Sequence, residues 1–76
     1  MSTHIISREG VASAINRLMV EPDGSKANQA ARNYAKNYLT QFSTGLREFA
    51  AKAPESLSAR QCIAIAVRID YLVEHS

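Results

Sequence analysis

Apolar residues recur at helical spacing along three stretches of the chain, and turn-forming residues separate these stretches. The segment 21–25 contains a proline and a glycine, which are typical of turns. A second break is centred on Pro54, because the residue before a proline is disfavoured in helical conformation. No stretch shows sustained alternation of apolar and polar residues. The pattern predicts an all-α fold with helices over about 8–20, 26–52 and 58–75.

The two first helices have serine candidates for their N-caps. Ser7 precedes a stretch in which Val11, Ile15 and Leu18 follow at intervals of four and three residues. Ser25 precedes the longer stretch, whose apolar residues span an arc of roughly 140–160° on a helical wheel. That arc is wider than one neighbouring helix requires. We expect this helix to continue through Gly45, with a kink or a close helix crossing there.

The third helix carries the capping pattern Ser58-x-x-Gln61, which predicts Ser58 as its N-cap. Leu57 and Cys62 flank that start and could form a hydrophobic contact across it. The helix has two apolar faces, which indicates burial on more than one side. We expect one face to contact the chain's own core and the other to contact a second subunit. The predicted core face comprises Cys62, Ile65, Ala66, Ile69, Leu72 and Val73.

Self-association is the expected supplement to a small core. The chain has 76 residues and buries only about 60% of the surface of its unfolded form. A single cysteine, Cys62, excludes an intramolecular disulfide, and no set of residues has the spacing of a zinc site. We therefore expect a single helical domain over 1–76 that forms a homodimer or tetramer as a helical bundle. The residues expected at the oligomer interface are Tyr34, Tyr38, Ile63, Val67 and Tyr71.

The motifs of the common enzyme and cofactor classes are absent from the sequence. It has no glycine-rich phosphate loop, no G-x-S-x-G, no paired histidines on a helix and no calcium-binding loop. Cys62 lies in an apolar run without a histidine at a useful spacing, so we expect it to pack inertly. No catalytic, metal or cofactor site is predicted. Without a membrane-spanning or signal sequence, the expected location is cytoplasmic, with no membrane partner.

Positive charge provides the one hint of a ligand. The formal net charge is +2, and no acidic residue occurs between Asp23 and Glu48. Arg32, Lys36 and Arg47 fall within about 60° of one another on the second helix. Such a stripe could bind phosphates or an acidic protein surface, or it could simply be a solvated helix face.

Three functions remain compatible with these features. The first is a non-enzymatic regulatory module that binds another protein and blocks or disrupts its assembly. In size and general character such a chain is similar to small antirepressor-like inhibitors, although no motif assigns it to a family. The second is a nucleic-acid-binding accessory protein that uses the basic stripe. The third is a structural subunit of a larger assembly.

Overall fold

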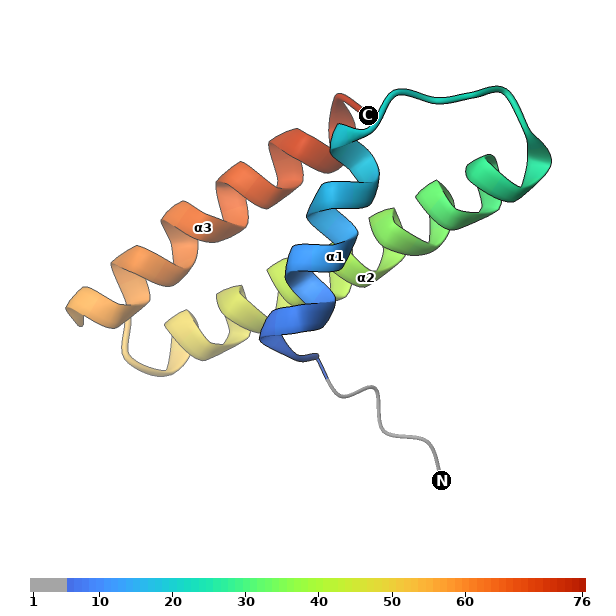
Figure 1. The fold of residues 1–76 in the computed structure, drawn as a ribbon. Coiled ribbons are helices and arrows are strands. Elements are labelled where there is room, and N and C mark those ends of the chain that lie inside the picture. Colours follow the sequence, from blue (N-terminus) through green and yellow to red (C-terminus); the bar gives the residue numbers. More distant parts are fainter. Residues whose placement is uncertain (1–5) are drawn as a thin grey trace.

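The part of the chain that the structure describes forms three α-helices, which confirms the all-α fold (Figure 1). It is a computed structural model that describes residues 6–76. No strand occurs within these residues. The first two helices begin where the pattern predicts, and each helix ends within one residue of its expected last position. The helices are α1 (Arg8–Met19), α2 (Lys26–Lys52) and α3 (Leu57–Glu74).

The caps of α1 and α2 are those expected from the sequence. The Ser7 hydroxyl accepts a hydrogen bond from the Gly10 amide at 3.0 Å, and the Ser25 hydroxyl accepts one from the Asn28 amide at 3.0 Å. Each bond satisfies an amide that has no partner within the first helical turn. Before α2, the Ser25 amide donates to a carboxylate oxygen of Asp23 at 2.8 Å. This bond holds the pKa of Asp23 below its ordinary value, because it stabilises the charged carboxylate.

The predicted cap of α3 is wrong by two residues. Ser56, not Ser58, is the N-cap: its backbone is extended and its hydroxyl accepts a hydrogen bond from the Ala59 amide at 3.0 Å. The Ser56 hydroxyl also donates to the Ala53 carbonyl at 2.8 Å, which ties the cap to the end of α2. Leu57 is therefore the first residue of the helix, and its side chain is exposed rather than packed across the helix start.

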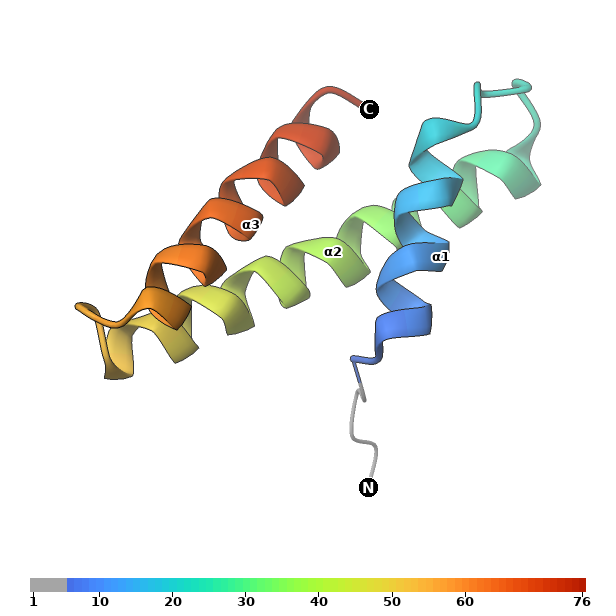
Figure 2. The same cartoon turned by 60° about the vertical axis from the view of Figure 1, so that its left-hand side comes forward.

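The long helix α2 is the element on which both other helices pack (Figure 2). It continues without interruption through Gly45, as expected. α3 returns antiparallel beside it, and α1 crosses its N-terminal half (Figure 1). The end of α3 lies near the end of α1, whereas the starts of these two helices are far apart (Figures 1 and 2). The result is an α2–α3 hairpin with α1 covering only part of one side.

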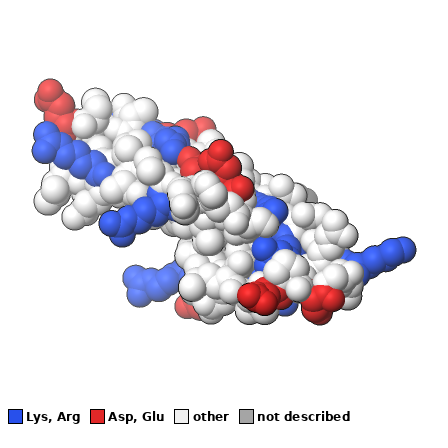
Figure 3. All heavy atoms as spheres, turned by 90° about the horizontal axis from the view of Figure 1, so that it is seen from above, with Lys and Arg blue, Asp and Glu red and all other residues white. Residues whose placement is uncertain are grey.

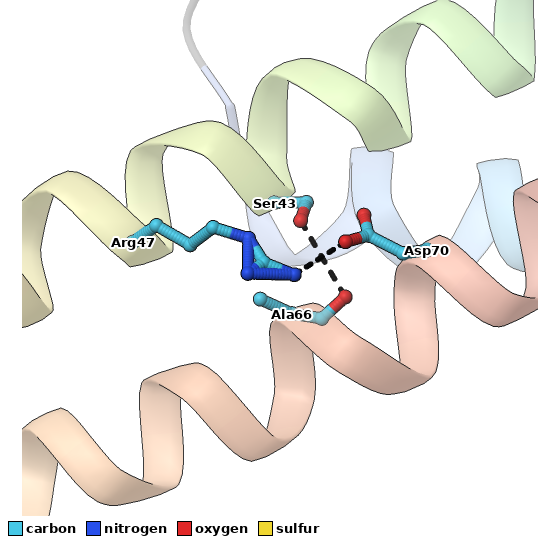
Figure 4. A network of polar contacts seen from close by, with 4 residues as sticks. All are labelled: Ser43, Arg47, Ala66 and Asp70. Carbon is cyan, nitrogen blue, oxygen red and sulfur yellow. Dashed lines mark hydrogen bonds and ion pairs between the residues drawn. The ribbon is translucent and has the colours of Figure 1, made fainter.

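Small side chains form the contact between α2 and α3. They recur every seventh residue, a spacing that keeps one side of each helix turned toward an antiparallel neighbour. Ser43 is buried, and its hydroxyl donates to the Ala66 carbonyl at 3.4 Å across the contact (Figure 4). Because such residues let two backbones approach closely, few large side chains fit between them. The buried small residues are Ser43 and Ala50 from α2, with Ala59 and Ala66 from α3.

The core is correspondingly thin. Five of the eight buried hydrophobic residues are alanines, and Leu39 is the one large side chain among the described residues that is fully buried. Leu18 from α1 and Ile69 from α3 join Leu39 in the main cluster, so Ile69 lies in the core as predicted. Leu72 packs against this cluster but is only half-buried.

Two residues of α3 are more exposed than the sequence suggested. Ile65 was expected in the core, yet 45% of its surface is accessible. Cys62 was expected to be buried and is only half-buried. The helical spacing identified the correct side of α3, but α1 does not extend far enough over the hairpin to cover this part of it.

The contact of α1 with α2 depends on the absence of a side chain at Gly10. A Cβ atom at this position would lie 2.1 Å from the Tyr38 hydroxyl oxygen. That hydroxyl accepts a hydrogen bond from the Ser7 amide at 3.1 Å, so it fixes the start of α1 on α2. Gly45, by contrast, has no atom within 4 Å of such a Cβ.

We expect Gly10→Ala and Gly45→Ala to change stability in opposite directions. Alanine is favoured over glycine within a helix by about 0.5–1 kcal/mol, so Gly45→Ala should stabilise the protein by that amount. Gly10→Ala should destabilise it by about 1–3 kcal/mol, because Tyr38 must move away and release Ser7. Urea unfolding followed by circular dichroism measures both. Stabilisation by Gly10→Ala would show that α1 does not pack on Tyr38 as described.

Separate replacement of Ser56 and Ser58 by alanine tests which of the two serines is the N-cap of α3. Ser56→Ala should cost about 0.5–2 kcal/mol in the free energy of unfolding, because the Ala59 amide loses its partner. Ser58→Ala should change it by less than about 0.5 kcal/mol, since Ser58 is an exposed residue of the first turn. Denaturant midpoints of the two variants test this assignment, and a larger effect at Ser58 would reverse it.

Candidate protein-interaction surfaces

Arg32, expected on a solvent-exposed basic face, is a buried residue with 8% of its surface accessible. Its guanidinium group donates to three main-chain carbonyl oxygens: Val20 at 2.7 Å, Arg17 at 3.3 Å and Ser76 at 3.3 Å. The expected solvent position is therefore wrong. The helical wheel placed Arg32 correctly beside Lys36, but it could not show that the chain segments before α2 and after α3 converge on this side.

The position of Arg32 follows from the chemistry of helix ends. The last carbonyls of a helix have no partner within the helix and carry a partial negative charge. Arg17 and Val20 lie at the end of α1. The positively charged guanidinium group donates hydrogen bonds to their carbonyls and is attracted by the partial negative charge of this helix end. The third hydrogen bond, to the Ser76 carbonyl, attaches the segment after α3 to the same guanidinium group. Arg32 thus acts as a structural residue that joins three segments.

The remaining residues of the predicted basic stripe do not form a continuous positive surface. Arg47 forms an ion pair with Asp70 of α3, and both side chains are partly exposed (Figure 4). Lys36 is half-buried. Acidic and basic side chains are also interspersed on the face shown in Figure 3. Because Arg32 is buried and Arg47 is paired with Asp70, the stripe lacks the continuous positive potential that phosphate binding requires.

The five residues expected at the oligomer interface fall into two separate groups. Tyr34 and Tyr38 line a pocket of about 310 Å³ beside α1, with their ring centroids 6.4 Å apart. Tyr34 is exposed, whereas Tyr38 is half-buried against the core and bonded to Ser7. The other three residues lie on α3, on the opposite side of the hairpin.

That second group forms an apolar strip, which we call the α3 stripe: Ile63, Val67 and Tyr71. All three are exposed, and 54% of the central Val67 is accessible. Val67 is turned about 140° around the helix from Leu72, which packs toward α1. The ring of Tyr71 stacks on His75 with centroids 3.9 Å apart. The stripe therefore faces away from α1 and has no covering element in the described part of the chain.

A second apolar surface lies on the α1 side of the hairpin. Its centre is a pocket of about 440 Å³ between α1 and α2, lined by Val11, Ile15 and Phe42 among others. Phe49 lies two helical turns beyond Phe42 on the same side of α2, and 58% of it is accessible. Exposed Ile65 adds the contribution of α3. We call these five residues the α1-side surface.

Sequence reasoning missed this surface as a site. It assigned Ile65 to the core and gave Phe42 and Phe49 no role beyond the wide apolar arc of the second helix. The width of that arc was the available signal, because α1 occupies only part of it. How far α1 extends over α2 depends on tertiary packing and could not be obtained from helical periodicity.

The α1-side surface is flanked by basic residues. Arg8 lines its pocket, Arg68 lies within about 60° of Ile65, and Lys52 lies within about 60° of Phe49. Every acidic residue of the three helices is turned about 100° or more away from the apolar residues of its own helix that form the surface. Those acidic residues are Glu9, Glu48, Asp70 and Glu74.

Two further findings concern metal and membrane binding. Among residues 6–76, no three histidine, cysteine, aspartate or glutamate residues come together as a metal site. In the same part of the chain, every helix is too short or too polar to cross a bilayer.

Replacement of Arg32 tests its structural role. Arg32→Met keeps most of the side-chain volume but removes hydrogen bonds from a charged donor, each of which contributes about 1.5–3 kcal/mol. We expect the free energy of unfolding to fall by at least that amount, measured by urea denaturation. Lys36→Met, one turn further along α2, is the control and should change stability by less than about 0.5 kcal/mol. Equal effects of the two changes would contradict the buried position of Arg32.

Comparison of the chain with models of protein families, with curated proteins and with solved structures finds no match in any of the three. Its two apolar surfaces must therefore be interpreted from their own geometry and charge.

Proposed function

We propose that this protein is a non-enzymatic regulatory module that binds an amphipathic helix of another protein on its α1-side surface. A helix held there is unavailable to its usual neighbours, so binding blocks or disrupts the assembly to which that helix belongs. The observation that carries the proposal is the exposure of Phe49 and Ile65 beside the apolar pocket formed by Val11, Ile15 and Phe42. Recognition of a helix in such a groove depends on apolar anchors about one turn apart.

The charges around the surface indicate the kind of helix that fits. Arg8, Lys52 and Arg68 flank it, and no acidic residue of the three helices shares its side. An incoming helix with apolar residues on one face and acidic residues along the edges would place opposite charges against these three. Complementary charge at the rim accelerates association and discriminates against basic partners.

Nucleic acid is the less favoured partner. The basic stripe that suggested it is reduced by the burial of Arg32 and by the pairing of Arg47 with Asp70. Three basic residues around an apolar surface neutralise few phosphates, whereas apolar anchors contribute little to phosphate binding. Aromatic side chains such as Phe42 and Phe49 are instead enriched in protein–protein interfaces.

A display selection tests the proposal. A library of helical peptides with a fixed apolar face and randomised flanking positions is selected against the folded protein. We expect enriched peptides to carry Asp or Glu at the flanking positions, because these face Arg8, Lys52 and Arg68. Binding of a selected peptide should fall at least about tenfold in Ile65→Glu, which places a charge among the apolar anchors. Val67→Glu, with the same new charge on the opposite side of α3, is the matched control and should bind normally.

Several results would overturn the proposal. They are a selection without binders, peptides without acidic enrichment, or peptides whose binding depends on Val67 rather than Ile65. Submicromolar, salt-sensitive binding of DNA or RNA at about 150 mM salt would instead favour the nucleic-acid alternative. Circular dichroism of each variant confirms that its helices are retained.

A further inference from the structure

The α3 stripe is a second exposed apolar surface, and the proposed partner helix does not use it. Its residues Ile63, Val67 and Tyr71 lie at successive intervals of four on the side of α3 that faces away from α1. Of the three, Ile63 lines a pocket of about 430 Å³ at the turn of the hairpin, together with Arg60 and Arg47 among others. What covers this stripe can be inferred from the surface area and from the order of charges along α3.

The protein exposes more surface than a compact monomer of its size. Its accessible surface is 5837 Å², whereas a compact monomer of 8.3 kDa exposes about 4,600 Å². Residues 1–5 would expose about 800 Å² at the accessibility of an unfolded chain, and a compact chain without them would expose about 4,300 Å². The remaining excess of roughly 700 Å² includes both the α1-side surface and the α3 stripe, and it is close to the ~800 Å² that each partner buries in a standard interface.

We propose that the α3 stripe is the interface of a homodimer in which the α3 helices of two copies cross antiparallel with Val67 at the two-fold axis. Antiparallel helices related by such an axis pair residues whose numbers are symmetric about the centre. Ile63 precedes Val67 by four residues and Tyr71 follows it by four. Ile63 of each copy therefore packs against Tyr71 of the other, and all three apolar residues of the stripe gain a neighbour.

The charges along α3 have the same symmetry. Arg60 lies seven residues before Val67 and Glu74 seven residues after it, so each Arg60 meets Glu74 of the other copy. Both residues lie within about 20° of Val67 around the helix, on the same side as the stripe. Within one chain they are about 21 Å apart along the helix axis, so they cannot pair with each other. This arrangement makes the stripe complementary to a second copy of itself.

The basic edges of the α1-side surface do not have this property. Two copies meeting there about a two-fold axis would bring like charges together, since no acidic residue of the three helices shares that side. The two surfaces of the hairpin thus differ in the occupant that they fit. The dimer inference is independent of the proposed function, because it rests on a different set of residues.

A charge-swap cycle tests the dimer and its register. Sedimentation equilibrium of the full chain should give about twice the 8.3 kDa monomer mass at micromolar concentration. Arg60→Glu and Glu74→Arg should each weaken the dimer at least about tenfold, because each sets like charges against one another. The double variant restores opposite charges at the same positions, so its dimerisation should return to near the wild-type level. Val67→Glu should abolish the dimer, whereas Ile65→Glu should leave it intact.

The alternatives give different results. A monomeric wild-type protein, or a double charge swap that remains monomeric, would overturn the inference. Loss of the dimer in Ile65→Glu with retention in Val67→Glu would place the interface on the α1-side surface instead. Circular dichroism and urea midpoints distinguish dissociation from unfolding in every variant. Failure of the peptide selection leaves these outcomes unchanged, so the two proposals fail separately.

Discussion

The guanidinium group of Arg32 is the point on which the arrangement of the helices depends. Its bonds to the carbonyls of Arg17, Val20 and Ser76 join the end of α1 to the end of the chain beyond α3. Both helices are thereby held close at one end of α2, while their starts diverge (Figure 2). The apolar side chains of the hairpin remain uncovered where α1 and α3 separate. One internal ionic group therefore determines where the α1-side surface opens.

The small residues between α2 and α3 explain why so much apolar surface remains outside. Ser43, Ala50, Ala59 and Ala66 allow the two helices to approach closely, and this leaves little space between them for large side chains. The aromatic and branched residues of both helices are consequently displaced to the two sides of the hairpin. An isolated chain packed in this way buries little apolar surface and gains little free energy from it. A dimer or a complex would bury the apolar side chains that remain exposed and would gain more. The stability of the fold and its capacity to bind are consequences of the same packing.

Helical periodicity was sufficient to predict the three helices, the caps at Ser7 and Ser25, and the core position of Ile69, because each depends on local geometry. The start of α3 was misplaced because Ser58, with Gln61 three residues after it, has the stronger local capping pattern. The Ser56 hydroxyl instead donates to the Ala53 carbonyl in the turn after α2 and accepts from the Ala59 amide, and this bond across the turn could not be read from the pattern. Arg32 and Ile65 could not be placed from periodicity, since the exposure of each depends on where other segments pass. The α3 stripe was identifiable because it requires only that three residues share one side of a helix.

The two apolar surfaces lie on opposite sides of the hairpin, and this has a consequence for how the proposed activities combine. In a dimer formed through the α3 stripe, the α1-side surface of each copy faces outward, so neither site is obstructed. Two identical sites in one particle can hold two helices of the same oligomeric target. The second binding event then occurs at the effective concentration set by the dimer, which strengthens attachment without any new contact. Dimerisation through Val67 would thus give a bivalent module, which competes with the target's own assembly more strongly than a single copy does.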